Sequence, residues 1–142
     1  MEYLTNYIRS EKIEVKHLGQ IAAGSTVEIF GYARKSLITR PRWAQKAEQV
    51  ATAEVCGDSL ADEDIRDGDR LVCKIIFDKS EVVAGKLVVA KLPSGGSVVK
   101  RIYFNKDKII LRSSNQKYKD LIFHKDDVEI EAIVKELIRS LE

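Results

Sequence analysis

From residue 50 to the C-terminus, apolar residues recur in short runs that are separated by turn-forming residues. Short runs rich in valine, isoleucine and leucine between turn signals are typical of β-strands. The predicted strands cover residues 50–55, 71–77, 86–92, 97–104, 109–112 and 128–137. In the last run apolar Val128, Ile130, Ala132 and Val134 alternate with charged residues, which predicts a strand with one buried face.

Turn signals lie between these strands at residues 67–69, 93–96 and 105–107. Gly95 and Gly96 separate two β-rich runs, and a glycine pair in that position favours a tight hairpin because glycine accepts positive φ angles. The C-terminal two thirds of the chain therefore predict a mostly β domain of short antiparallel strands.

The first 50 residues give a weaker pattern. Apolar residues three to four positions apart within residues 1–12 predict one short helix. Residues 19–25 are small and suit an exposed, extended segment, whereas residues 26–50 are ambiguous, with Trp43 as an anchor in a loop. We expect a mobile N-terminal arm over residues 1–24 and one domain over residues 25–142.

The composition limits the class of protein. Apolar residues make up 44% of the 142 and charged residues 32%, a balance typical of one soluble globular domain. The net charge of +2, from 24 basic and 22 acidic residues, gives no electrostatic signature of nucleic-acid binding. The basic residues between 34 and 42 are interpreted as a solvated loop. No apolar run could span a bilayer and no signal peptide is present, so we expect no membrane partner and a cytoplasmic location.

Metal and disulfide chemistry receive little support. Cys56 and Cys73 form no disulfide framework and are interpreted as small buried thiols, and His17 and His124 lack ligand spacing. The acidic residues at 62–64 and 67–69 lack the oxygen-ligand pattern of a calcium loop and are interpreted as solvated turns. We expect no cofactor and no metal.

Ser59 is a candidate nucleophile. It follows Gly57 and Asp58 directly after a predicted strand, and a glycine there allows a sharp turn whose free N–H groups could stabilise an oxyanion. A plain surface turn explains the same three residues. Serine becomes a nucleophile only when a base removes its proton, and neither histidine lies near this motif.

Lys100 is the candidate base. In a strand it shares one face with Val98 and Ile102, while Arg101 faces the opposite way. Burial among apolar side chains disfavours the ammonium form and would supply a neutral amine. The alternative is an ordinary strand lysine whose amine reaches solvent.

A third short segment, Ala22-Ala23-Gly24, is small enough to enter a narrow catalytic cleft. Five ordered blocks together resemble the self-cleaving serine–lysine peptidase domain shared by LexA, UmuD and the lambda-type phage repressors. They occupy residues 18–24, 55–60, 65–72, 85–90 with 98–101, and 111–118. One departure is Glu131-Ala132, near a position where that family commonly has glycine.

The resemblance implies a β-clip type of fold and a cut between Ala23 and Gly24. It also implies Ser59 as nucleophile, Lys100 as general base, and an oxyanion held by the backbone N–H groups of Asp58 and Ser59. The implied partners are a second copy of the chain, as a homodimer, and an activated RecA-type recombinase filament in the SOS response to DNA damage.

Three roles for such a domain remain open. The chain could be a UmuD-like accessory of an error-prone DNA polymerase, or the regulatory domain of a LexA-like or phage repressor. Only 23 residues precede the predicted cut, so we expect the helix-turn-helix DNA-binding domain of such repressors to be absent from this chain. The third role is a non-catalytic dimerisation module that retains the same fold.

Overall fold

The computed structural model describes residues 11–22 and 34–139 of the chain. These residues form nine strands joined by turns and by four short 3₁₀ helices, so the predicted mostly β class is confirmed. The strands are β1 (Lys12–Ala22), β2 (Arg34–Thr39), β3 (Val50–Cys56), β4 (Arg70–Ile75), β5 (Leu87–Lys91), β6 (Ser97–Asn105), β7 (Lys108–Arg112), β8 (Leu121–His124) and β9 (Glu129–Ile138). The 3₁₀ helices are η1 (Ala47–Gln49), η2 (Ala61–Glu63), η3 (Lys79–Glu81) and η4 (Lys125–Asp127).

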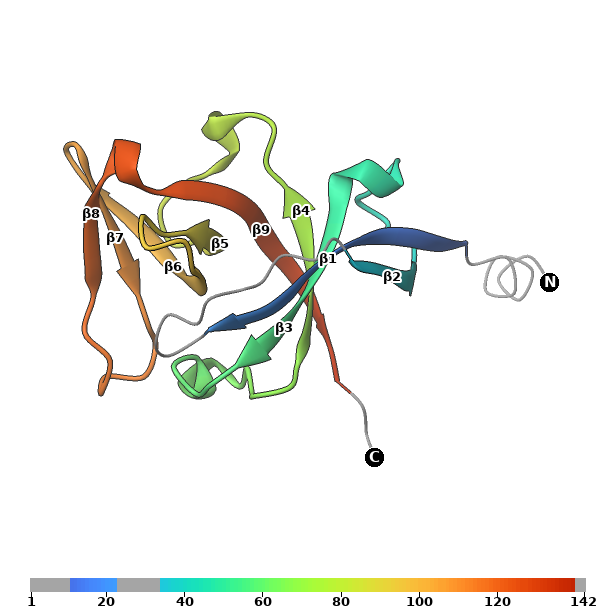
Figure 1. Ribbon diagram of the computed structural model, residues 1–142, viewed down its shortest axis with the longest axis horizontal. Coiled ribbons are helices and arrows are strands. Elements are labelled where there is room, and N and C mark those ends of the chain that lie inside the picture. Colours follow the sequence, from blue (N-terminus) through green and yellow to red (C-terminus); the bar gives the residue numbers. More distant parts are fainter. Residues whose placement is uncertain (1–10, 23–33, 140–142) are drawn as a thin grey trace.

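All nine strands belong to one sheet, in the order β2-β1-β3-β4-β9-β5-β6-β7-β8. The long strand β9 joins the two halves, because it pairs with β4 on one side and with β5 on the other. Figure 1 shows β9 running through the middle of the molecule, with β6, β7 and β8 to its left and β2 to its right.

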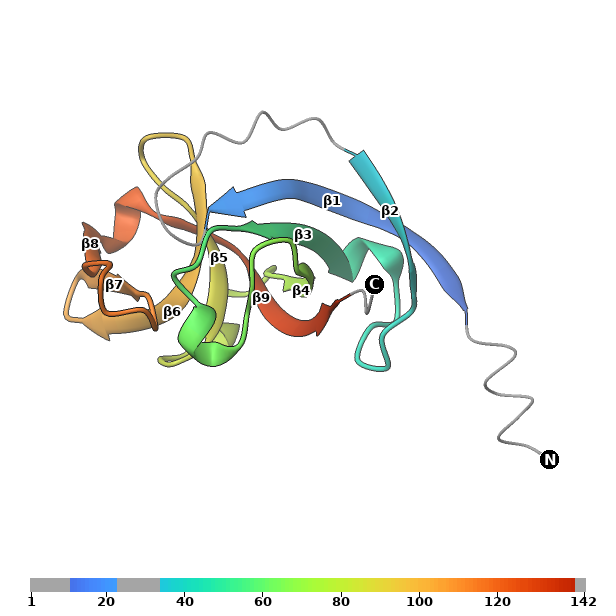
Figure 2. The ribbon, with the colours of Figure 1, turned by 90° about the horizontal axis from the view of Figure 1, so that it is seen from below.

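Strand β1 makes the sheet mixed rather than purely antiparallel. It pairs antiparallel with β2 and parallel with β3, and its last residue, Ala22, also pairs with Val98 of β6. The sheet therefore curls back on itself at this point, and Figure 2 shows β1 lying along β3 with its end near β6. The sequence predicted an extended segment here but not its place in the sheet.

Three clusters of buried apolar side chains fill the curl. One lies among β3, β4, β5 and β9, the second among β5, β6, β7 and β9, and the third under β1 and β2, where it includes Ile13, Val15 and Ile38. Strand β6 is buried on both faces, since Val98 and Ile102 belong to the second cluster and Val99 to the first. A polar side chain on β6 between Val98 and Ile102 therefore faces an apolar environment.

Strand β9 departs from the predicted alternation. Its consecutive residues Ala132 and Ile133 are both buried, because they face opposite sides of the sheet and belong to the first and the second cluster respectively. The register shift opposite β5 leaves Glu131 as an extra residue. A second register shift, opposite β4, leaves Lys135 as another extra residue. Such β-bulges bend a strand, which allows β9 to pair with two different neighbours. Glu131-Ala132 is the pair near which the sequence departs from the pattern of the resembled family.

The six predicted strands after residue 50 are confirmed to within two residues as β3, β4, β5, β6, β7 and β9, and Gly95, with φ of +97°, lies in the predicted hairpin. The sequence missed β2 and β8. Residue 12 begins β1, and the remainder of the predicted helix over residues 1–12, apart from Glu11, lies outside the described residues.

Candidate active site

Ser59 lies in the turn between β3 and η2. Gly57 has a φ of +109°, a conformation that favours glycine, and it lets the chain leave β3 sharply. The Gly57 N–H donates to Asp67 Oδ1 at 2.9 Å, which ties the turn to the following loop. The Ser59 side chain is 0% exposed, and its Oγ makes no hydrogen bond to any described residue. A buried hydroxyl without such a partner is unusual and indicates a catalytic role for this residue.

Lys100 lies in β6 between Val98 and Ile102, as the strand pattern predicted. Its side chain is 1% exposed, so the alternative in which the amine reaches solvent is wrong. Burial lowers the pKa of the Lys100 amine from 10.5 to about 8, because the ammonium form loses its hydration. A substantial fraction of this lysine is therefore neutral near pH 8.

Residues 113–115, which follow β7, contact both candidates. Ser113 Oγ accepts a hydrogen bond from Lys100 Nζ at 2.5 Å. The Ser59 carbonyl oxygen accepts from the Asn115 N–H at 2.8 Å and from Ser114 Oγ at 3.2 Å. One three-residue segment thus holds the backbone of Ser59 and the amine of Lys100.

Asp58 is fixed by the same part of the chain. Its carboxylate accepts hydrogen bonds from Tyr118 OH at 2.5 Å and from Lys117 Nζ at 2.9 Å. These donors, Tyr118 first, hold the pKa of the Asp58 carboxyl below its usual value. The Tyr118 ring centroid lies 5.8 Å from Lys100 Nζ, so Tyr118 contacts both sides of the site.

The backbone N–H of Ser59 donates to no other described residue, whereas the N–H groups of Gly57 and Ala61 are both used. The Asp58 N–H interacts with the carboxylate of its own side chain. Unused N–H groups beside a nucleophile are what an oxyanion hole requires. The prediction for Asp58 and Ser59 as oxyanion donors remains a prediction.

Ala23 and Gly24, the predicted cleavage site, lie outside the described residues. The described chain before them ends at Ala22, which pairs with Cys56 of β3 and with Val98 of β6. Cys56 is three residues before Ser59, and Val98 is two residues before Lys100. Strand β1 therefore leads the chain to the site from between the two strands that carry the candidate residues.

Comparison with known proteins identifies the family. Residues 16–135 match the family model described as Peptidase S24-like, which is most of the chain. The chain belongs to the Peptidase S24-like family. The matched span contains Ser59, Lys100 and the whole of segment 113–118.

Several relatives of this S24-like chain are LexA proteins. The chain is 32% identical over 130 residues to a LexA repressor of Pelagibacter ubique, which covers 91% of the chain and 56% of that protein. It is 27% identical over 128 residues to the transcription regulator LexA of Synechocystis, covering 90% and 62% respectively. A LexA repressor of Syntrophobacter fumaroxidans is 30% identical over 128 residues, covering 90% and 59%. The chain thus spans about three fifths of the length of these relatives.

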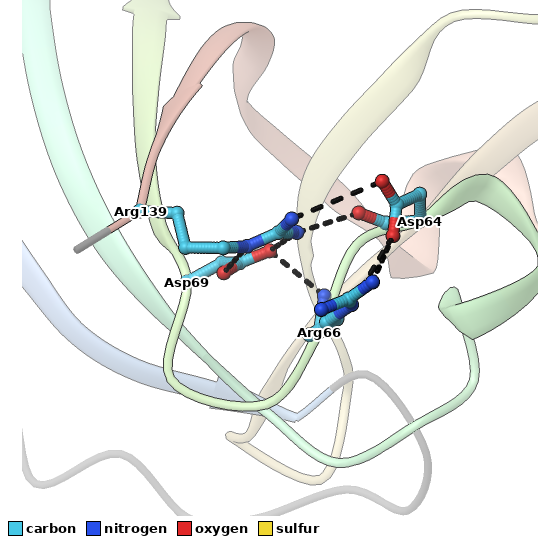
Figure 3. Close-up of polar contacts among 4 residues, drawn as sticks. All are labelled: Asp64, Arg66, Asp69 and Arg139. Atoms are coloured by element: carbon cyan, nitrogen blue, oxygen red, sulfur yellow. Dashed lines mark hydrogen bonds and ion pairs between the residues drawn. The ribbon is translucent and has the colours of Figure 1, made fainter. Parts of the chain in front are cut away.

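One of the acidic residues that the sequence placed in solvated turns of this S24-like domain is buried. Asp69 is 3% exposed and accepts from Arg139 Nε at 2.8 Å, from Arg139 Nη2 at 2.6 Å and from the Arg66 N–H at 2.8 Å. Arg139 also donates to the Asp64 carbonyl oxygen at 2.7 Å, and Figure 3 shows its guanidinium between Asp69 and Asp64. The interpretation is therefore wrong for Asp69, whose charge is compensated by an arginine 70 residues away.

The cysteine and histidine side chains that the structure describes form no catalytic or metal site. Cys73 is buried, and burial raises the pKa of its thiol to about 12, which leaves it unreactive. His17 contacts Thr52 Oγ1 at 2.7 Å. Among the described residues, no group of three or more histidine, cysteine, aspartate or glutamate side chains could hold a metal ion. Within residues 11–22 and 34–139, no helix has the length and apolar character that crossing a bilayer would need.

The sequence indicated no separate role for Ser113 and Ser114. They entered the prediction only as members of segment 111–118, one of the five segments that resemble the family. The register of the β6–β7 hairpin could have found Ser113. Arg101 pairs with Arg112, so the next position along both strands sets Lys100 opposite Ser113. The turn at residues 105–107, which fixes this register, was visible in the sequence.

Proposed function

We propose that this chain is the self-cleaving serine–lysine peptidase domain of a LexA-like regulator, and that it cuts its own Ala23–Gly24 bond. The observation that carries the proposal is that one segment, residues 113–115, binds both the Ser59 backbone carbonyl and the buried Lys100 amine, while the Ser59 hydroxyl is itself buried. Membership of the Peptidase S24-like family supports it independently.

In the first step, neutral Lys100 removes the proton from Ser59 Oγ, which attacks the carbonyl carbon of Ala23. The carbonyl oxygen becomes an oxyanion, and the N–H groups of Asp58 and Ser59 stabilise it. The intermediate then collapses as the Lys100 ammonium gives its proton to the Gly24 nitrogen, which leaves as an amine. An ester between Ser59 and Ala23 remains.

In the second step, a water molecule attacks this ester while Lys100 accepts a proton from the water. Collapse of the second intermediate returns the proton to Ser59 and releases the Ala23 carboxylate. Because the scissile bond belongs to the same chain, its effective concentration at the site is high. A modestly activated nucleophile is then sufficient.

The LexA names of the relatives favour a role in transcription regulation, with cleavage as the switch. The proposal includes the homodimer and the RecA-type filament that the family resemblance implies. A UmuD-like role with an error-prone polymerase is the less favoured alternative, because the relatives described above are LexA proteins.

The first prediction concerns the cut itself. Purified protein incubated at about pH 10 is expected to lose residues 1–23 and to leave a fragment that begins at Gly24, because Lys100 is then almost entirely neutral. Intact mass under denaturing conditions measures both pieces. Ser59→Ala and Lys100→Ala are expected to stay whole over the same period.

Cleavage in either variant, or a cut at a different bond, would contradict the assignment of Ser59, Lys100 or Ala23. A wild-type chain that stays intact even with an activated recombinase filament would instead favour the non-catalytic dimerisation module.

The second prediction is a pH profile with its midpoint near 8. The cleavage rate follows the neutral fraction of Lys100, so it is expected to rise about tenfold between pH 7 and pH 10 and to level off above pH 9. Initial rates in a series of buffers at constant ionic strength measure this profile. A midpoint near 10.5, the ordinary value for lysine, would show that the base is an exposed amine.

A further inference from the structure

The hydrogen bond between Lys100 and Ser113 restricts the position of the Lys100 amine. Ser113 is 7% exposed, and its Oγ lies 2.5 Å from Lys100 Nζ. It follows the last residue of β7, directly opposite Lys100 in the continued register of the β6–β7 hairpin. The paired residues Ile102 and Leu111, one step closer to the turn on the same face, are fully buried. The backbone therefore fixes where this hydroxyl lies relative to the amine.

A lysine base needs its lone pair directed at the proton that it accepts. The side chain has four rotatable bonds, and a neutral amine carries two N–H donors and one lone pair. When one N–H is donated to Ser113 Oγ, the directions left for the lone pair are restricted. The neighbouring Ser114 and Asn115 fix the Ser59 carbonyl through hydrogen bonds. Any displacement of residues 113–115 thus moves both members of the pair together.

We propose that Ser113 is a positioning residue that orients the Lys100 amine toward Ser59 for self-cleavage. This inference rests on the proposed function and adds a third side chain to the serine–lysine pair. Ser113 does not touch the reacting atoms, so its effect passes through Lys100.

Other ionisable groups face Lys100 and must be kept constant in any test. The Tyr118 ring lies 5.8 Å from Lys100 Nζ, and Tyr118 OH is bound to Asp58. Lys117 pairs with the same carboxylate at 2.9 Å, so these two charges compensate each other. Substitution of Ser113 leaves each of these groups in place.

The test compares Ser113→Ala with Ser113→Thr, which keeps a hydroxyl, and with Ser94→Ala, which removes an exposed serine from the β5–β6 turn. We expect Ser113→Ala to lower the maximal cleavage rate about ten- to hundredfold, the cost typical of a misplaced catalytic group. The pH midpoint should also fall by roughly one unit, since the ammonium form loses an acceptor. Ser113→Thr should cleave within about threefold of wild type, and Ser94→Ala should match it.

A second measurement does not depend on cleavage. In a Ser59→Ala background, NMR titration of ¹³Cε-labelled lysines gives the Lys100 pKa directly, and adding Ser113→Ala should lower it by roughly one unit. An unchanged Lys100 titration together with an unchanged cleavage rate would overturn the role of Ser113. If wild type never cleaves, the proposed function fails, and the titration alone then decides whether Ser113 binds the Lys100 amine in solution. A pKa lowered by Ser113→Ala would support that contact, and an unchanged one would overturn it.

Discussion

Lys100→Met is expected to abolish self-cleavage and also to make the fold more stable at pH 7. Methionine has a similar length and no charge, so it fits among Val98, Ile102 and their neighbours without the cost of burying an ammonium group. The lowered Lys100 pKa corresponds to a gain on the order of 1–3 kcal/mol in the free energy of unfolding at pH 7.

The gain should depend on pH in a defined direction. The folded-state pKa of Lys100 lies below the unfolded value, so between about pH 8 and 10.5 the unfolded chain binds more protons. The stability of the lysine protein therefore rises with pH across that window, and its difference from the methionine variant shrinks. Urea unfolding at pH 7 and pH 10, both in a Ser59→Ala background that prevents cleavage, measures the effect.

Lys91→Met is the matched control, because Lys91 is exposed on the adjacent strand β5. It should change the free energy of unfolding by less than about 0.5 kcal/mol. If Lys100→Met proves less stable than wild type at pH 7, the hydrogen bonds of the amine outweigh its burial cost.

Arg139→Ala is expected to destabilise the domain by about 2–4 kcal/mol. It removes both side-chain donors from the buried Asp69 carboxylate and leaves only the Arg66 N–H. An uncompensated buried charge carries a cost of this size. Asp69 lies in the turn that donates to and accepts from Val55 at the end of β3, so the loss also loosens the chain near Ser59.

The effect should fade in acid. Arg139 holds the pKa of the Asp69 carboxyl below its usual value, so the pair contributes stability above the unfolded pKa of about 3.9 and loses it as pH falls through the folded value. Urea unfolding at pH 7 and pH 3 tests this direction. Arg66→Ala is the control, since its guanidinium forms an ion pair with exposed Asp64 and its backbone N–H, which donates to Asp69, remains. Equal losses in both variants would contradict a special role for Arg139.

The strands after residue 50 were predictable because each is a short apolar run between strong turn signals. Strand β1 was not, because its stability comes from pairing with β2 and β3, which lie far along the chain from residues 12–22. The bulge at Glu131 was also hidden, since the alternation of residues 128–134 fits an unbroken strand equally well.

In the candidate site, too, features that depend on neighbouring residues were predictable, and features that depend on distant residues were not. The buried position of Lys100 was predictable from its neighbours on β6, whereas the buried charge of Asp69 was not, because Arg139 reaches it only through the fold. For Ser113 the residue type predicted nothing, whereas the register of the β6–β7 hairpin predicts its position opposite Lys100.

The cut proposed here would divide the chain without separating the pieces. Residues 12–22 form β1, which is hydrogen-bonded to β2 on one side and to β3 on the other, and Ile13 and Val15 are buried in the third apolar cluster. A released N-terminal peptide would therefore stay bound as a non-covalent strand, as in a fragment-complementation pair. Under native conditions the cut protein should elute as one species, and a competing peptide with the sequence of β1 could exchange into the gap.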